Sequence, residues 1–167
     1  RSDLIERVRH NVRLQRSGHP WAKLDDLELL KSARLYQRDY QTGQEGVSMA
    51  GALLFGRDEV VLGVVPHHRT DAILRVHDLD RYDDRDDIRT NLLESYDRLM
   101  AFVYKHITDP FYLEGTQRVS LRERIFREVV ANLLVHREYL NPFPAKLIIQ
   151  RDRVITENSN NPHGIGL

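Results

Sequence analysis

The sequence predicts an α+β protein whose first two-thirds are mainly helical and whose C-terminal part is a helix followed by a β-hairpin. Apolar residues recur at helical spacing over residues 88–107 and again over residues 120–139. Residues 145–150 and 153–157 are rich in β-branched side chains and flank a short polar turn, which is typical of a hairpin. At 167 residues, the chain is long enough for one domain with a real core or for two small ones.

The first part, residues 1–46, is expected to be a helical linker region. Apolar residues at helical spacing predict a short amphipathic helix within residues 1–18, and its basic face is either solvated or a nucleic-acid contact. Asp25 or Asp26 is suited to cap a second helix. Residues 39–46 are polar and predict a turn.

The second part, residues 47–167, is expected to form a separate domain. Ser48 as an N-cap and Gly56 as a terminator favour a helix between them. Residues 58–65 suit a helix and a strand equally well. Apolar and polar side chains alternate over residues 70–76, which predicts a strand.

An acidic segment, residues 78–87, contains six aspartates. A calcium-binding loop would need a glycine in its middle, and this segment has none. We therefore expect a solvated loop that leads into the helix at residues 88–107, whose positive N-terminal end suits acidic neighbours. Residues 111–119 are expected to add a short strand.

The helix at residues 120–139 is the most distinctive element. Ser120 and Glu123 have the spacing of a capping box, and the Asn-Pro pair at 141–142 ends the helical pattern. Its apolar face is broad, so we expect the helix to be largely buried. On this background Glu128, Asn132 and His136 form a polar stripe at i, i+4 and i+8. This stripe is either a structural hydrogen-bond network or a ligand site.

Composition narrows the class of protein. Lys plus Arg and Asp plus Glu are both 25, so the formal net charge is zero, which argues against gripping nucleic acid by bulk electrostatics. The absence of cysteine excludes disulfides and favours a cytoplasmic location. Apolar runs fall short of the ~20 residues of a membrane span, so no membrane partner is expected. Because the chain begins at Arg1, it is expected to be a piece of a longer polypeptide.

Two stretches of the chain resemble a known family. The first runs Phe126-Arg-Glu-Val-Val-Ala-Asn-Leu-Leu-Val-His-Arg-Glu-Tyr139 and precedes the hairpin; the second is Ala-Gly-Ala-Leu-Leu-Phe-Gly, which ends at Gly56. Together they resemble RecG-related proteins, which are labelled transcriptional regulators or ATP-dependent DNA helicases. The C-terminal part of that family is similar to the histidine-kinase-like (GHKL) ATPase fold. The resemblance covers the chain from about residue 24 onward and implies that residues 47–167 are a partial GHKL-like domain.

This resemblance implies ATP and Mg²⁺ as cofactors. GHKL ATPases carry a Glu-x-x-x-Asn motif on the corresponding helix, so Glu128 would be the general base and Asn132 the metal ligand. An amide oxygen is a hard ligand that suits Mg²⁺ held by phosphates. A carboxylate one turn away can orient or deprotonate the attacking water. His136 and Arg137 would lie near the phosphates or at a domain contact.

The adenine side of the implied site departs from the family pattern. The family has an Asp-x-Gly-x-Gly motif after a strand, and its aspartate accepts a hydrogen bond from the adenine amino group. Here Asn158 follows the predicted strand, and Gly164 and Gly166 come at a different spacing. These three residues are the remaining cofactor-binding candidates. The glycine-rich lid over the phosphates would lie after Leu167.

Three hypotheses about function follow. The resemblance implies a fragment of an ATP-dependent regulator that binds DNA through a missing N-terminal Schlafen AlbA-like domain, with ATP hydrolysis expected of the longer polypeptide. The alternative is a non-catalytic regulatory or oligomerisation module, a homo-oligomer that positions such a DNA-binding domain. The third is direct nucleic-acid binding by the basic residues 1–16. The sequence has no Gly-x-x-x-x-Gly-Lys-Ser/Thr loop, which argues against helicase activity.

Overall fold

The computed structural model describes residues 1–77 and 80–158. Helices and strands are both present, which confirms the predicted α+β class. The chain forms two compact units: unit 1 comprises Arg1–Val64 and Thr90–Leu93, and unit 2 comprises Val65–Arg89 and Glu94–Leu167. The boundary expected after residue 46 therefore falls inside unit 1, within a strand.

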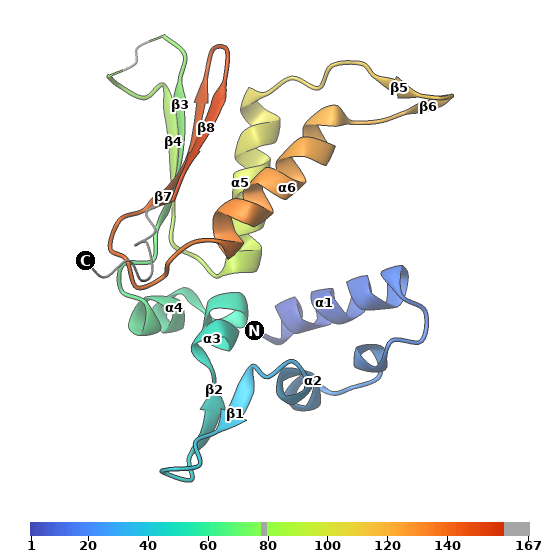
Figure 1. Cartoon of the computed structure of the whole chain (residues 1–167), viewed down its shortest axis with the longest axis vertical. Coiled ribbons are helices and arrows are strands. Elements are labelled where there is room, and N and C mark those ends of the chain that lie inside the picture. The colour runs from blue at the N-terminus through green and yellow to red at the C-terminus, as the bar shows by residue number, and fades with distance from the viewer. Residues whose placement is uncertain (78–79, 159–167) are drawn as a thin grey trace, which may run out of the picture. The chain divides into compact units, whose positions relative to one another are not determined.

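Unit 1 is mainly helical (Figure 1). Asp25 caps its second helix in a full capping box, and Ser48 caps the helix that was expected after it. Residues 58–65, which suited a helix or a strand, contribute a helix whose first turn is acidic. The elements are α1 (Ser2–Gln15), the 3-10 turn η1 (Pro20–Ala22), α2 (Asp26–Ser32), β1 (Tyr36–Arg38), β2 (Glu45–Val47), α3 (Met49–Phe55) and α4 (Asp58–Val64).

The core of unit 1 joins three helices. Leu4 and Ile5 of α1 pack with Leu29 of α2 and Phe55 of α3, and all four side chains are buried. The apolar side of the predicted amphipathic helix is thus the side that faces the core.

Two basic residues of α1 are engaged within unit 1. Arg9 is buried and binds Glu6 and Asp26, the latter at 2.6 Å from Nη2 to Oδ1. Arg13 donates to the carbonyl of Ala22 at 3.1 Å. These arginines therefore hold α1 against the turn and helix that follow it, and a nucleic-acid interface would have to rely on the other basic residues.

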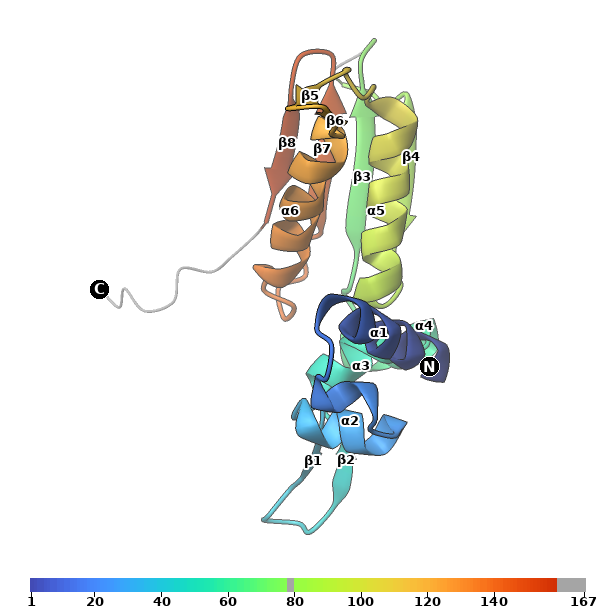
Figure 2. The ribbon, with the colours of Figure 1, turned by 90° about the vertical axis from the view of Figure 1, so that its right-hand side faces the viewer.

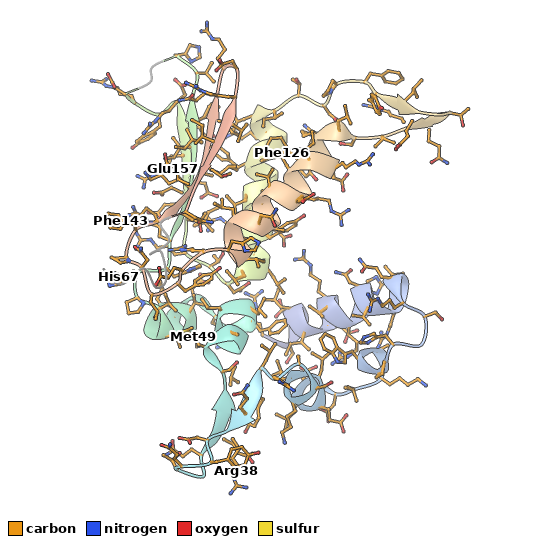
Figure 3. The ribbon with its side chains drawn as sticks, in the orientation of Figure 1. Arg38, Met49, His67, Phe126, Phe143 and Glu157 are labelled. Carbon is orange, nitrogen blue, oxygen red and sulfur yellow. The ribbon has the colours of Figure 1, made fainter. Side chains whose placement is uncertain are left out.

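A short hairpin replaces the simple turn expected over residues 39–46. β1 and β2 pair antiparallel, with Tyr36 opposite Val47. The Asp39 carboxylate accepts from two groups of the turn, the backbone N–H of residue 41 and the hydroxyl of residue 42. Arg38 lies at the end of β1, near the tip of this hairpin (Figure 3). The strands are only three residues long, which is why sequence alternation did not reveal them.

Gly51→Ala is expected to destabilise unit 1 by about 1–3 kcal/mol because the added methyl group overpacks the core. A Cβ at this position would lie 2.6 Å from the Val47 side chain and 2.8 Å from the Leu35 carbonyl oxygen. Gly63→Ala is the matched control: a Cβ there meets nothing within 4 Å, and helix propensity favours alanine by about 0.5–1 kcal/mol. Urea unfolding measures both variants, and equal effects would contradict the packing at Gly51.

Unit 2 is a four-stranded sheet with two helices on one face (Figures 1 and 2). The strand order is β4-β3-β7-β8; β3 and β7 are parallel, and the outer pairs are antiparallel. The predicted hairpin forms β7 and β8. The elements are β3 (Thr70–Arg75), β4 (Asp84–Ile88), α5 (Leu92–His106), β5 (Leu113–Glu114), β6 (Gln117–Arg118), α6 (Leu121–Val135), β7 (Ala145–Gln150) and β8 (Val154–Glu157).

The prediction for the acidic segment was partly wrong. Residues 84–88 form the edge strand β4 instead of a loop and the start of a helix, and α5 begins only at Leu92. Residues 78–79 of this segment lie outside the described residues. Aspartate disfavours strands in general, so partners elsewhere in the chain must compensate for its low propensity.

Side chains of α5 supply those partners. Asp84 accepts from Lys105 Nζ at 2.7 Å and lies 2.7 Å from His106 Nε2, while Asp86 binds Arg98. The hydrogen bonds from Lys105 and His106 lower the pKa of Asp84 to about 2. The pairing also identifies the face of β4 that α5 covers. Because residues in register share a face, Ala72 of β3, opposite Asp86, lies on this covered face.

Candidate functional site

The polar stripe of α6 lies on the exposed side of the helix, so the prediction of a largely buried helix was wrong. Glu128, Asn132 and His136 are all exposed, and the buried side is formed by other positions. Within the described residues, neither Glu128 nor Asn132 makes a side-chain hydrogen bond. A structural network is therefore not what occupies these two side chains. The buried residues of α6 are Phe126, Val130, Leu133 and Leu134.

Glu128 and Asn132 line a surface hollow of about 470 Å³ together with Arg124 and Tyr112. A second hollow of about 470 Å³ continues along α6 toward its N-terminal end and shares Glu128 and Arg124. Both hollows are open to solvent, so their volume alone does not identify a ligand site. The second hollow is lined by Arg118, Val119, Ser120, Glu123, Arg124, Arg127 and Glu128.

Arg124 is the residue that sequence reasoning missed. It lies four positions before Glu128, so the stripe at Glu128, Asn132 and His136 extends backwards by one helical turn. Its guanidinium contacts Glu114 at 3.3 Å, and both side chains are exposed, so this ion pair contributes little stability. The same i, i+4 spacing that selected the other three residues was the available signal.

Asn158 joins the end of β8 to α6. Its Nδ2 donates to the carbonyl oxygen of Leu133 at 3.1 Å, and Leu133 follows Asn132 in the helix. The Oδ1 atom of Asn158 is buried and accepts no hydrogen bond within the described part of the chain. Buried polar atoms normally have partners, so this oxygen is a candidate acceptor for a ligand donor. Gly164 and Gly166, the other two candidates of this segment, lie outside the described residues.

His136 and Arg137 are placed differently from the stripe. The helix ends at Val135 instead of residue 139, and His136 is its C-cap. Arg137 turns inward and is only 6% exposed; its Nη1 donates to the Arg69 carbonyl at 2.6 Å and to Thr70 Oγ1 at 3.3 Å. Neither residue lines either of the two hollows. The burial of Arg137 lowers the pKa of its guanidinium.

Tyr139 explains why the helix stops early. Its hydroxyl donates to the Leu134 carbonyl at 2.5 Å, so one C-terminal carbonyl of α6 is capped by a side chain from the following turn. The ring stacks against His68, with 5.8 Å between the centroids, and lies beneath the guanidinium of Arg137. Burial of the phenol raises the pKa of Tyr139 to about 12.

In the hollow, Asn132 and Glu128 are the side chains that could supply oxygens to a metal ion. Among the described residues there is no group of three or more His, Cys, Asp or Glu side chains that could hold a metal ion. Asn132 offers one hard oxygen, and Mg²⁺ typically takes only one or two protein ligands beside phosphate oxygens and waters. Whether the hollow binds Mg²⁺ stays a prediction.

Comparisons with known proteins bear on the N-terminal part. A family model described as a domain of unknown function (DUF8451) matches residues 1–71. Neither the curated proteins nor the solved structures contain a match to the chain. The matched residues end within β3, before α6 begins. Within residues 1–77 and 80–158, no helix combines the length and apolar character needed to cross a membrane.

Proposed function

We propose that unit 2 binds a Mg²⁺-nucleotide along α6 as a GHKL-like module of a cytoplasmic, DNA-associated transcriptional regulator. The observation that carries this proposal is the attachment of Asn158 to α6. Asn158 anchors to Leu133, next to Asn132, while its own Oδ1 remains buried and without a partner in the described region. Asn158 lines neither hollow, so its role beside the Glu128–Asn132 pair is taken from the family resemblance. Association with DNA rests on that resemblance alone.

Each residue has a distinct role in this proposal. Asn132 supplies an oxygen to Mg²⁺, and Arg124 balances the charge of the phosphates at the same hollow. The Oδ1 atom of Asn158 accepts from the adenine amino group. Glu128 orients the attacking water for hydrolysis, a step that also needs a lid over the phosphates. ATP binding, and not hydrolysis, is therefore the activity to test with this chain.

Asn132→Ala is expected to abolish Mg²⁺-nucleotide binding and to change the free energy of unfolding by less than about 0.5 kcal/mol. The side chain is exposed and makes no hydrogen bond within the described residues, so its loss leaves no buried group unsatisfied. Isothermal titration with Mg-ATP and Mg-ADP measures binding, and urea unfolding measures stability. A loss of about 1–3 kcal/mol with binding unchanged would instead assign Asn132 to a structural network.

Arg153→Lys is the control for that titration, because Arg153 is exposed at the β7–β8 turn and lines neither hollow. Binding by this variant should equal that of the parent chain. The proposal fails if the parent chain binds neither nucleotide.

A second candidate function is assembly, favoured by apolar side chains around β5 and β6. Phe111 is 71% exposed, and Tyr112, Leu113 and Ile125 are also among the exposed large hydrophobic residues. Neighbouring charges alternate in sign, as in the Arg124–Glu114 pair, which suits a second copy better than a highly charged partner. Size-exclusion chromatography with light scattering tests this function, and a strict monomer, in this chain and in the longer polypeptide, would remove it.

A further inference from the structure

One edge of the Arg137 guanidinium has no hydrogen-bond acceptor among the described residues. Its Nε and Nη2 atoms are both buried and make no hydrogen bond within the described residues, although the side chain is more than nine-tenths buried. A buried charge is costly unless it is paired, and each unmet hydrogen bond to a charged group adds to that cost. The described part of unit 2 is thus chemically incomplete at this position.

Other arginines of unit 2 show what this edge binds. Arg89 directs Nε and Nη2 to the two carboxylate oxygens of Asp87, at 3.0 and 3.1 Å. Arg85 directs the same two atoms to a single oxygen, Oδ1 of Asp71, at 3.3 and 2.8 Å. The Nε and Nη2 hydrogens point in parallel from one side of the guanidinium, a spacing that matches two oxygens of a carboxylate or a phosphate. We call this pair of donors, Nε and Nη2, the fork. The fork of Arg137 has no acceptor among the described residues.

The fork of Arg137 is held in place by its surroundings. The opposite atom, Nη1, is bound by the Arg69 carbonyl and by Thr70 Oγ1, which fixes the plane of the guanidinium. The Tyr139 ring lies under it, with 5.4 Å between the guanidinium carbon and the ring centroid. A donor pair that is already oriented loses little entropy when it binds.

The immediate environment favours a negative group. Arg69 lies close enough to repel the Arg137 charge, and its own side chain is 34% exposed. The only carboxylate paired with Arg69 in the described residues, Asp71, already receives Arg85 as well. Residues 159–167 contain neither Asp nor Glu.

We propose that the Nε and Nη2 edge of Arg137 is a binding site for an oxyanion, a phosphate or carboxylate group that reaches it from outside the described residues. The site lies at the start of β3 and uses Arg137 with Arg69 as its neighbouring cation. It does not depend on nucleotide binding at Glu128 and Asn132, because neither arginine lines those hollows.

The test observes Arg137 directly. The ¹⁵Nε–¹Hε resonance of Arg137 is assigned in the full chain by its loss in Arg137→Lys. Sodium phosphate and sodium acetate are then titrated separately, at constant ionic strength, into a buffer that contains neither anion. We expect a saturable downfield shift of the Arg137 resonance. Tighter binding in the phosphate arm identifies a phosphate-bearing ligand, and tighter binding in the acetate arm identifies a carboxylate-bearing one.

Two comparisons keep the result specific. The Arg153 resonance reports an exposed arginine and should show no saturable shift. Arg137→Lys keeps the charge but loses the two parallel N–H donors. The concentration of the preferred anion that is needed to raise the melting temperature should therefore be on the order of tenfold higher for this variant than for the parent chain. The proposal is overturned if neither anion moves the Arg137 resonance, if Arg153 responds at the same concentrations, or if the resonance is already fully shifted without any added anion. The last result would show that the chain itself supplies the acceptor. These measurements are independent of nucleotide binding. Failure of the Asn132→Ala prediction would therefore leave the expected results for Arg137 unchanged.

Discussion

Leu147→Ala is expected to lower the free energy of unfolding by about 2–5 kcal/mol. Leu147 is fully buried in β7, a strand with neighbours on both sides, and it pairs with Ala72 of β3, which is also fully buried. The loss of the side chain removes buried apolar area and leaves a cavity that paired strands cannot easily close. Urea unfolding followed by far-ultraviolet circular dichroism measures the change.

Leu140→Ala is the matched control, because it is the same substitution at a position that is 75% exposed. Its effect should remain within about 0.5 kcal/mol. If Leu147→Ala costs no more than this control, the interior of unit 2 does not lie between the sheet and its two helices. Since α6 packs on that sheet, the candidate nucleotide site would then lose its scaffold as well.

The stability of unit 2 is expected to fall as the pH rises from about 10 to about 12, because of Tyr139. Burial raises the pKa of this phenol from 10.0 to about 12 in the folded protein. Below pH 10 the phenol is neutral in both states, so its full contribution is present. Between the two pKa values the unfolded state releases a proton that the folded state keeps, and this favours unfolding. Two pKa units correspond to at most about 2.7 kcal/mol.

Tyr139→Phe separates this effect from other groups that titrate in alkali. The variant lacks the hydrogen bond to Leu134 and should begin about 0.5–1.5 kcal/mol less stable at neutral pH. Above pH 10 it should lose less stability than the parent chain, so the two curves of unfolding free energy should converge. Tyr104, whose pKa is also raised by burial, is present in both proteins and cancels in the comparison. Parallel curves through pH 12 would contradict the burial of the Tyr139 phenol.

Several elements could be predicted because their signals are local in sequence. Asp25, Ser48 and Ser120 each accept from a backbone N–H three residues later, and all three caps were recognisable from residue type and spacing. The β7–β8 hairpin likewise follows from β-branched residues around a polar turn. Glu128 and Asn132 of the predicted stripe lie in α6 and are both exposed, whereas His136 is its C-cap.

The direction in which that stripe faces was not a local property. The apolar residues of α6 outnumber those that the core can accept, so periodicity alone favoured a buried helix. The sheet and α5 take up one side of α6, and Glu128 and Asn132 remain on the other. Whether they bind a nucleotide stays a prediction.

Partners distant in the chain account for the remaining differences. Strand β4 forms because Asp84 meets Lys105 and His106, which lie 21 and 22 residues later. Arg137 reads as the continuation of a helix, yet it reaches the Arg69 carbonyl, 68 residues earlier. Residue types and short-range spacing were therefore sufficient for the fold class and the helix caps. The strand among the aspartates and the buried arginine fork depended on long-range charge pairing and desolvation, which no short segment of sequence contains.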